Sequence, residues 1–384
     1  VPHLRFTEFS GEWKEELLDR IATLSKGIGI PKEQLSEDGD PCILYGELYT
    51  KYKSEIIKQV ESKTDIDGSK LKRSKANDVI IPCSGETAVD IATARCVPFD
   101  SILLGGDLNV ISLHKYDGAF MSYQLNGKRK YDIARVAQGV SVVHLYGEHL
   151  KTIKTYNPTL PEQQKIAILL SLLDERIATQ NKIIEDLKKL KCAIIEKLYS
   201  KIQGKEYSYG QLFDVVNERN KQMEYYNILS ASQEKGMVNR DDLNLDIQFE
   251  RSNINTYKIV RKGDYVIHLR SFQGGFAFSD KLGVCSPAYT ILRPNSLLEY
   301  SYLSYYFTSQ RFIKSLIIVT YGIRDGRSIN VEEWLNMKVV IPSKEHQLHT
   351  LNVLKRIDDK VENEEKYATC LSNQKQYLLR QMFI

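Results

Sequence analysis

Short basic clusters are the part of this sequence best suited to binding chemistry. Residues 69–75 read SKLKRSK and residues 126–130 read NGKRK, while HLRSFQGG (268–275) and TYGIRDGRSIN (320–330) place arginine and glutamine among glycines. Lysine clusters mostly contact phosphate, whereas arginine and glutamine can form two hydrogen bonds to a guanine or adenine edge. The stretches therefore predict DNA contacts, with a solvated surface as the alternative for each cluster. The predicted DNA-binding residues are Lys70, Lys72, Arg73, Lys75, Lys128, Arg129, Lys130, Ser141, His144, Arg270, Gln273, Tyr321, Arg324 and Arg327.

Motifs for catalysis are weak by comparison. A DNA methyltransferase needs an Asn/Asp-Pro-Pro-aromatic loop, and the chain has no Pro-Pro pair. The one GxG, at Gly27 and Gly29, lacks a third glycine before a helix and is typical of a simple turn. The stretch TDIDG (64–68) lacks the glutamate that completes a calcium loop, and His346 with His349 lacks a third metal ligand. We find no convincing catalytic constellation and predict no metal site.

Composition indicates an ordinary globular protein. A chain of 384 residues, with 42% hydrophobic and 27% charged residues, can form two or three domains. It has no apolar run of about 18 residues, and its start lacks the order of a secretory signal, so we expect a cytoplasmic protein without a membrane span. The six cysteines stand singly, which favours a reducing compartment and argues against disulfides and zinc. A net charge of +4 does not by itself indicate nucleic-acid binding.

The chain contains an internal duplication. Shifting the sequence by 184 residues aligns 153–200 with 337–384 without a gap, and eight of these 48 positions are identical, where composition alone would give roughly three. Upstream, FMSYQL (120–125) matches YLSYYF (302–307). The identical pairs are Lys154/Lys338, Pro158/Pro342, Gln163/Gln347, Leu170/Leu354, Asp174/Asp358, Lys182/Lys366, Leu187/Leu371 and Lys191/Lys375. Each half is thus a globular segment followed by one long helix.

Both predicted helices carry a heptad pattern. Apolar residues recur with a 4-3-4-3 spacing, and polar residues occupy the same layers in both copies, including Lys191 and Lys375. This pattern predicts that the two helices pair with each other as a coiled coil. About 40 residues at ~1.5 Å each give a length of roughly 60 Å, or some 17 base pairs at ~3.4 Å. The predicted pairing residues are Ile166, Leu170, Leu173, Ile177, Leu187, Ile194, Leu198, Leu354, Ile357, Val361, Leu371, Leu378 and Met382.

The globular segments read as mixed α and β structure. Short apolar runs such as DVIIP, VSVVHLY and YTILRP are typical of strands broken by Gly, Pro and Asp, with short helices between them. The fold class is therefore α+β, with two mixed α/β domains separated by an antiparallel helix pair. We predict domain 1 at 1–157, a central helix at 158–203, domain 2 at 204–341 and a terminal helix at 342–384.

The chain as a whole resembles the specificity subunit of type I restriction-modification systems, the HsdS family. The resemblance lies in LRFTEFSGEW, in the two helix starts PTLPEQQKIAILLSLLDERI and PSKEHQLHTLNVLKRIDDKV, in KGDYVIH with GVCSPAYTILRPN, and in GIRDGRSINVEEWLNMKVVIPS. The second helix start departs from the family pattern at His346 and Leu348. The resemblance implies two target-recognition domains that each read one half of a split, asymmetric DNA sequence, with the helices as a spacer.

The same resemblance implies the partners. Two methyltransferase subunits (HsdM) would bring S-adenosylmethionine, and restriction subunits (HsdR) would bring ATP and magnesium, so the chain would direct adenine methylation and restriction without a cofactor or catalysis of its own. The exposed helix residues Glu185, Lys188 and Lys189 are candidates for methyltransferase docking, with a solvated face as the alternative. Two other functions stay open as alternatives. The first is a nuclease or methyltransferase with an unrecognised site, and the second is a coiled-coil adaptor that binds only proteins.

Overall fold

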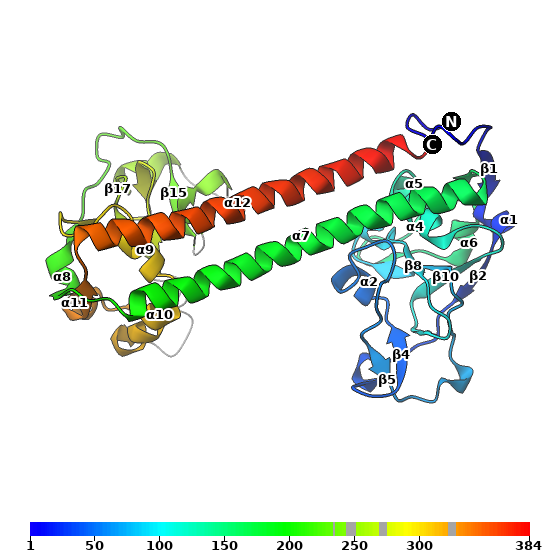
Figure 1. Cartoon of the computed structure of the whole chain (residues 1–384), viewed down its shortest axis with the longest axis horizontal. Coiled ribbons are helices and arrows are strands. Elements are labelled where there is room, and N and C mark those ends of the chain that lie inside the picture. The colour runs from blue at the N-terminus through cyan, green and yellow to red at the C-terminus, as the bar shows by residue number, and fades with distance from the viewer. Residues whose placement is uncertain (233–234, 243–250, 269–274, 322–327) are drawn as a thin grey trace. The chain divides into compact units, whose positions relative to one another are not determined.

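A computed structural model shows two compact units, each containing one globular segment and one end of each long helix (Figure 1). Unit 1 is Val1–Lys182 with Glu365–Ile384, and unit 2 is Ile183–Glu364. The predicted domains ended where the long helices began. In the structure, each unit also includes part of both long helices. The structure describes residues 1–232, 235–242, 251–268, 275–321 and 328–384.

The elements of unit 1 alternate short strands with short helices. In chain order they are β1 (Lys14–Leu17), α1 (Leu18–Ile21), β2 (Ala22–Lys26), η1 (Lys32–Gln34), β3 (Leu35–Ser36), β4 (Asp40–Ile43), α2 (Glu47–Thr50), β5 (Lys63–Thr64), η2 (Gly68–Lys70), β6 (Asp78–Pro82), β7 (Ser84–Gly85), α3 (Ala88–Ile91), β8 (Arg95–Val97), β9 (Leu103–Leu104), β10 (Leu108–Leu113), α4 (Gly118–Asn126), α5 (Lys130–Val136), β11 (Val143–His144), α6 (Gly147–Lys151) and β12 (Lys154–Asn157).

Unit 2 follows the same plan. Its elements are β13 (Lys205–Ser208), α8 (Tyr209–Leu212), β14 (Phe213–Val216), β15 (Leu229–Ser232), β16 (Gly236–Asn239), η3 (Arg240–Asp242), η4 (Arg251–Thr256), β17 (Lys258–Val260), β18 (Tyr265–Ile267), β19 (Phe276–Phe278), β20 (Gly283–Cys285), β21 (Thr290–Pro294), α9 (Tyr302–Tyr306), α10 (Gln310–Ser315), η5 (Leu316–Val319), β22 (Thr320–Tyr321), β23 (Ser328–Ile329), α11 (Val331–Asn336) and β24 (Lys338–Ile341).

The two units have matching sheets. Each contains a four-stranded antiparallel sheet, in the order β2–β10–β6–β8 in unit 1 and β14–β21–β18–β19 in unit 2. Each also pairs its first and last strands, β1 with β12 and β13 with β24. The continuous apolar run of β6 is buried along its whole length, as expected for a strand inside a sheet. The duplication seen in the sequence is therefore a duplication of topology.

The cores behind these sheets differ in composition. Unit 1 is packed mainly with aliphatic side chains such as Leu18, Val79 and Ile111. Unit 2 is rich in aromatic rings, with Tyr209 stacked on Trp334 at 4.2 Å between ring centroids. Cores of equal pattern but different side chains keep one topology, because close packing can be satisfied by more than one set of residues.

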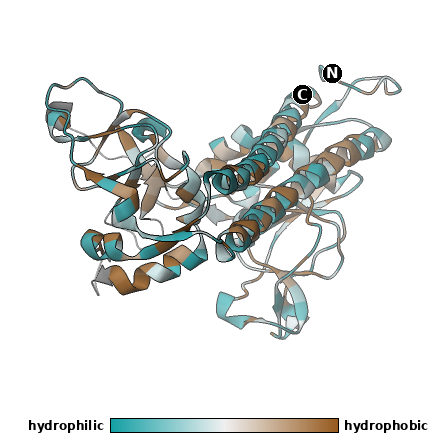
Figure 2. Ribbon diagram, turned by 60° about the vertical axis from the view of Figure 1, so that its left-hand side comes forward, coloured by the Kyte–Doolittle hydropathy of each residue, from teal (hydrophilic) through white to brown (hydrophobic). Residues whose placement is uncertain are grey.

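Helices α7 (Leu160–Ser200) and α12 (Lys344–Gln381) pair antiparallel within each unit (Figure 1). In unit 1, the guanidinium of Arg176 donates to the hydroxyl of Tyr367 at 2.6 Å, while residue 174 meets residue 375. Hydrophobic residues recur along both helices between hydrophilic ones (Figure 2). All thirteen predicted pairing residues are buried or partly buried. The antiparallel coiled coil predicted by the heptads is confirmed.

The heptad register drifts toward the globular segments. Ile195 and Leu379 are buried more deeply than the predicted Ile194 and Leu378 beside them. A straight helix turns every 3.6 residues, not 3.5, and these ends also pack against the globular segment of their own unit. The buried face therefore rotates by one residue near the C-terminal end of each helix.

The GxG motif at Gly27 and Gly29 and the acidic stretch TDIDG (64–68) both have local structural roles. Gly27 ends β2 where the chain passes close to a neighbouring loop, and a Cβ there would lie 1.9 Å from the carbonyl oxygen of Gly105. In TDIDG, the carboxylate of Asp67 accepts from the amide of Ser69 at 3.0 Å and caps η2. Gly27 therefore permits a close approach of two backbone segments, and Asp67 caps a short helix.

Candidate nucleic-acid interface

Most of the predicted base-reading residues of unit 2 lie outside the described residues. They are Arg270, Gln273, Arg324 and Arg327. Tyr321 closes β22, whose partner strand β23 pairs Ile329 with Thr320 and Ser328 with Tyr321. The predicted second reading loop thus begins and ends on one antiparallel strand pair.

The first basic cluster of unit 1 lies beside its second four-stranded sheet, β3–β5–β4–β9, whose strands are short. The guanidinium of Arg73 donates to the carboxylate of Asp40 at 2.5 Å and to the carbonyl oxygen of Ser101 at 2.9 Å. These bonds tie Arg73 to the protein, but its side chain is 39% exposed and its DNA contact stays a prediction. Lys70 and Lys75 are exposed and remain available to a phosphate.

The second basic cluster divides in the same way. Arg129 is turned inward, with its guanidinium donating to the main-chain oxygen of Ile384 at 2.9 Å and lying 5.2 Å from the ring centre of Tyr156. Its position joins the end of the described chain to the globular segment of unit 1. Lys128 is exposed and Lys130 begins α5. Two of the three predicted cations therefore stay at or near the surface.

Ser141 and His144 belong to a hairpin formed by residues 138–144. Gln138 and His144 exchange two main-chain hydrogen bonds, of 2.9 and 2.7 Å, and β11 pairs with β7 at the base of the hairpin. Ser141 is exposed at the tip, and the ring of His144 stacks on Tyr146 with 6.1 Å between centroids. The hairpin holds both predicted residues at the surface.

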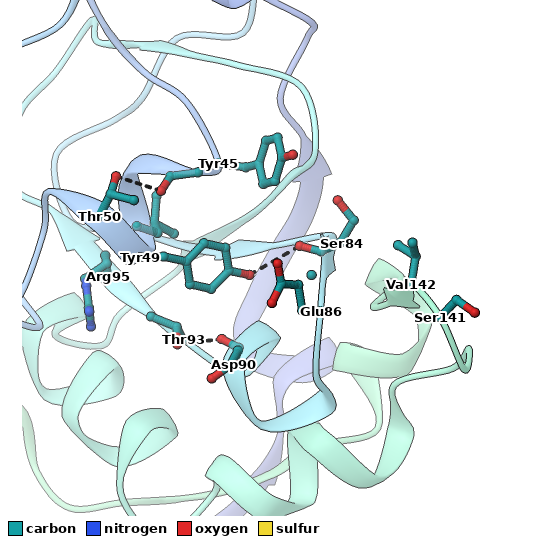
Figure 3. Close-up of a pocket in the computed structure, with 13 residues that line it drawn as sticks. Tyr45, Tyr49, Thr50, Ser84, Glu86, Asp90, Thr93, Arg95, Ser141 and Val142 are labelled. Atoms are coloured by element: carbon teal, nitrogen blue, oxygen red, sulfur yellow. Dashed lines mark hydrogen bonds between the residues drawn. The ribbon is translucent and has the colours of Figure 1, made fainter. Parts of the chain in front are cut away.

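A pocket of about 750 Å³ opens beside hairpin 138–144 (Figure 3). The hydroxyl of Tyr49 donates to the carbonyl oxygen of Ser84 across the pocket at 3.2 Å. The pocket is lined by Tyr45, Gly46, Leu48, Tyr49, Thr50, Ser84, Gly85, Glu86, Asp90, Thr93, Arg95, Ser141 and Val142. Of these residues, the sequence analysis named Ser141 alone, because the others come from three separate stretches whose proximity depends on the fold.

Cationic and apolar side chains gather near the same hairpin. Helix α3 packs against β7, β11 and α5, the helix that begins at Lys130. Tyr131 on α5 and Val140 at the hairpin tip are 64% and 98% exposed. Cations suit phosphates, while exposed apolar side chains and hydroxyls suit base edges. This part of unit 1 combines both kinds of group.

A buried charged cluster attaches the helices to the globular segment of unit 1. The ammonium of Lys375 on α12 lies 2.6 Å from the carboxylates of both Asp174 on α7 and Glu55. Asp174 also accepts from the hydroxyls of Tyr123 at 2.7 Å and Ser54 at 3.0 Å. Burial alone would lower the pKa of Lys375, but the two carboxylates outweigh it and hold that pKa above its ordinary value.

Unit 2 repeats the central part of this cluster with the helices exchanged. Lys191 on α7 forms an ion pair with Asp358 on α12, and the hydroxyl of Tyr305 donates to Asp358 at 2.6 Å. Burial, with a smaller effect of the Asp358 hydrogen bond, raises the pKa of Tyr305. Lys191 corresponds to Lys375 and Asp358 to Asp174 in the sequence repeat. The predicted polar layer thus has the same partners twice.

Other identical positions also repeat their contacts. Gln163 bonds the amide of Asp117 ahead of α4, and Gln347 bonds the amide of Glu299 ahead of α9. Both glutamines donate to the carbonyl oxygen of the proline that precedes their helix. The repeat keeps these residues because they orient the helix against the globular segment.

One strong contact of unit 1 has no equivalent in the repeat. The guanidinium of Arg5 donates twice to the carboxylate of Glu162, at 2.7 Å for both bonds, and the indole of Trp13 approaches the same carboxylate at 3.3 Å. The position that matches Glu162 in unit 2 is His346, which is exposed. The departure at His346 is thus explained, since the carboxylate in unit 1 serves the segment that contains Arg5.

The fold and these contacts define a class of protein: a duplicated chain in which two units of one topology are joined to a shared antiparallel helix pair. Among the described residues, no group of three His, Cys, Asp or Glu side chains could hold a metal ion. Within the same residues, no helix is long and apolar enough to cross a membrane.

Comparison with known proteins identifies the family. Residues 11–189 match the model of the type I restriction modification DNA specificity domain. The type I restriction enzyme MjaVIII specificity subunit of Methanocaldococcus jannaschii is 25% identical over 76% of this chain and 74% of its own length. Residues 11–189 therefore form a type I restriction modification DNA specificity domain, and the chain as a whole is similar to type I restriction-modification specificity subunits. It is a non-catalytic subunit that recognises DNA sequence in a complex with other subunits, as predicted.

Solved structures share the fold over the whole chain. The S subunit of a type I restriction-modification system from M. genitalium covers 100% of this chain and 99% of its own, with a TM-score of 0.57 and 17% identity. A chain from a study of complex assembly and conformational transition of the type I R-M system covers 97% of both, with a TM-score of 0.61 and 14% identity. Low identity with full coverage shows that the architecture persists while side chains change.

Proposed function

We propose that this subunit reads a bipartite, asymmetric DNA sequence, with one half-site read by each unit and the gap between the half-sites set by helices α7 and α12. The observation that carries the proposal is the repeated contact of Lys375, Asp174 and Tyr123 in Lys191, Asp358 and Tyr305. The same side chains attach each globular segment to the helix pair, so each reader has the same attachment.

The partners follow from this symmetry and from the family. Two equivalent surfaces suit two copies of one partner, which we take to be methyltransferase (HsdM) subunits that methylate adenine. Restriction subunits (HsdR) would join the same complex. S-adenosylmethionine, ATP and magnesium would then be bound by these partners and none by this chain, in the cytoplasm. The exposed α7 residues Glu185, Lys188 and Lys189 are the candidate docking positions.

Base reading is assigned to the loops of each unit. In the first half-site the readers are Ser141 and His144, and in the second they are Arg270, Arg324 and Arg327. Replacing Arg327 with alanine should relax one base position of the second half-site by ~1–3 kcal/mol, because a bidentate contact to guanine would be lost. Uniform weakening across all sequences would instead make Arg327 a phosphate contact.

The proposal is tested by producing the chain with its methyltransferase partner in a host that lacks other methylation, and then mapping methylated adenines across the genome. We expect one motif made of two specified parts with a constant gap. A continuous motif would contradict the proposal.

DNA affinity separates the proposal from an adaptor that binds only proteins. We expect the affinity of the complex for its site to fall steeply with salt, because phosphate contacts release counterions. A DNA affinity that is independent of both salt and sequence would support the adaptor. Turnover of DNA by the purified chain alone would support an enzyme.

A further inference from the structure

The tip of hairpin 138–144 presents apolar side chains that the core does not use. Val140 is 98% exposed and Val142 is 52% exposed, while their neighbour Val143 is buried in the core of unit 1. Isolated exposed valines are common, but these two lie at the tip of a hairpin that one pair of main-chain hydrogen bonds closes. A narrow hairpin with an apolar tip can enter the major groove of DNA.

Two features of the main chain constrain this tip. Gly139 has a φ of +122°, and a Cβ at that position would lie 2.1 Å from the carbonyl oxygen of Val142. The two main-chain bonds between Gln138 and His144 close the loop just behind the tip. A loop held in this way loses little conformational entropy when it binds.

Glu86 stands on the pocket that the hairpin tip also lines. It follows directly after β7, the strand that pairs with β11 of the hairpin. Figure 3 draws Glu86 among the side chains that line this pocket, together with Tyr49, Ser141 and Val142. Within the part of the chain that the structure describes, no group donates a hydrogen bond to the Glu86 carboxylate, so its acceptor oxygens are open to a ligand.

The second carboxylate of the pocket has a different environment. Asp90 accepts from the hydroxyl of Thr87 at 2.6 Å, and Thr87 in turn caps α3 by accepting from the amide of Asp90. Asp90 is therefore part of the helix start. Glu86 is the carboxylate of this pocket that can serve a ligand.

The chemistry of these groups selects a ligand. A carboxylate is repelled by phosphate but accepts a hydrogen bond from the exocyclic amino group of cytosine, and an exposed valine fits against the methyl group of thymine. Helix α5, which packs on α3 and begins at Lys130, can supply positive charge to nearby phosphates.

We propose that Glu86 and Val140 are specificity-determining residues of unit 1, reading neighbouring base pairs in the major groove of double-stranded DNA. Glu86 accepts from the amino group of cytosine, and Val140 contacts the methyl group of thymine. The inference rests on the proposed function, since it names the residues through which unit 1 reads its half-site.

The test uses the complete methyltransferase complex and a library of sites randomised at every specified position. With Glu86→Gln, we expect discrimination for cytosine at one position of one half-site to fall about tenfold or more, and preference to move toward adenine, because an amide pairs with adenine. With Val140→Ala, preference for thymine at a neighbouring position should fall a few-fold. Glu12→Gln, an exposed carboxylate in the same unit, is the matched control and should leave every position unchanged.

The outcomes separate this inference from the proposed function. If the wild-type complex methylates a two-part motif and both variants keep the wild-type preference at every position, the inference is overturned and the proposed function stands. Equal weakening of all sequences by both variants would also overturn it. If the wild-type complex shows no two-part motif, the proposed function fails instead. We expect each variant to have the wild-type midpoint of thermal unfolding, because the replaced side chains are exposed. That result would show that the fold is retained.

Discussion

The ammonium of Lys375 on α12 lies 2.6 Å from the carboxylate of Asp174 on α7, and Lys191 and Asp358 form the same pair with the helices exchanged. The two pairs differ in burial. The Lys375 and Asp174 side chains are 12% and 7% exposed, whereas those of Lys191 and Asp358 are 28% and 36% exposed. We therefore expect the two ion pairs to contribute unequally to the free energy of unfolding.

Removing the two lysines should show this difference. Lys375→Met leaves the buried carboxylates of Asp174 and Glu55 without their ion-pair partner and should lower the free energy of unfolding by ~3–5 kcal/mol. Lys191→Met should cost about 1 kcal/mol or less, because that pair is partly solvated. Urea unfolding, with amide exchange to separate the two units, measures both. Equal losses would mean that burial does not decide the strength of these pairs.

The Arg5–Glu162 contact should anchor the first residues of unit 1. Glu162 is 1% exposed, so Arg5→Ala leaves a buried carboxylate without its cation and should destabilise unit 1 by ~3 kcal/mol. Proteolysis should then begin within residues 1–11. The neighbouring pair of Lys165 with Glu8 is exposed on both sides, so Lys165→Ala is the control and should cost about 1 kcal/mol or less. A similar loss in both variants would contradict this reading.

Gly139 should be required for the shape of hairpin 138–144. A methyl group there would collide with the carbonyl oxygen of Val142, and the positive φ is costly for alanine. Gly139→Ala should speed exchange of the His144 amide, which bonds the carbonyl oxygen of Gln138, and should weaken reading of one half-site. Gly29→Ala, where a Cβ meets nothing within 4 Å, should leave both unchanged. Unaltered exchange in Gly139→Ala would show that the tip adapts.

Thiol reactivity should separate the cysteines into two groups. Cys192 and Cys370 are exposed on the helices, whereas Cys42, Cys83 and Cys96 are buried. Burial raises the pKa of Cys42 and Cys83 to about 11 and that of Cys96 to about 12. Iodoacetamide should therefore label Cys192 and Cys370 in the native protein and the others only after unfolding. Rapid native labelling of Cys96 would contradict the buried assignment.

The same thiols give a pH dependence. Their folded-state pKa values lie above the unfolded value of ~8.5, so the folded state retains protons that the unfolded state releases. Stability from these groups is fully present below pH ~8.5 and is lost as pH rises toward the folded-state values. Urea midpoints should fall between pH 9 and pH 11 on that account. Replacing Cys96 with alanine should reduce the slope, at the cost of a small cavity.

Much of the architecture could be predicted because the repeat and the heptads can be recognised from residue identity and polarity along the chain. Eight identities at a constant shift located both long helices, and their apolar spacing predicted the antiparallel pair. The deviation at Ile195 and Leu379 could not be predicted, since it depends on how each helix end packs against its own globular segment.

The candidate interface was predicted less completely. Basic clusters marked stretches 69–75 and 126–130, but charge alone did not separate Arg73 and Arg129, which bond within the protein, from the lysines beside them. Glu86 carried no signal in the sequence, because its neighbours in the pocket come from distant stretches.

The sequence by itself determined the duplication, the helix pair and the family, since periodicity and repeated side chains depend on local order along the chain. Only the tertiary structure decided which charges are partners and which face solvent. That choice depends on which atoms the fold brings within hydrogen-bond distance, as when Tyr123, Glu55 and Lys375 meet around Asp174 from positions scattered along unit 1.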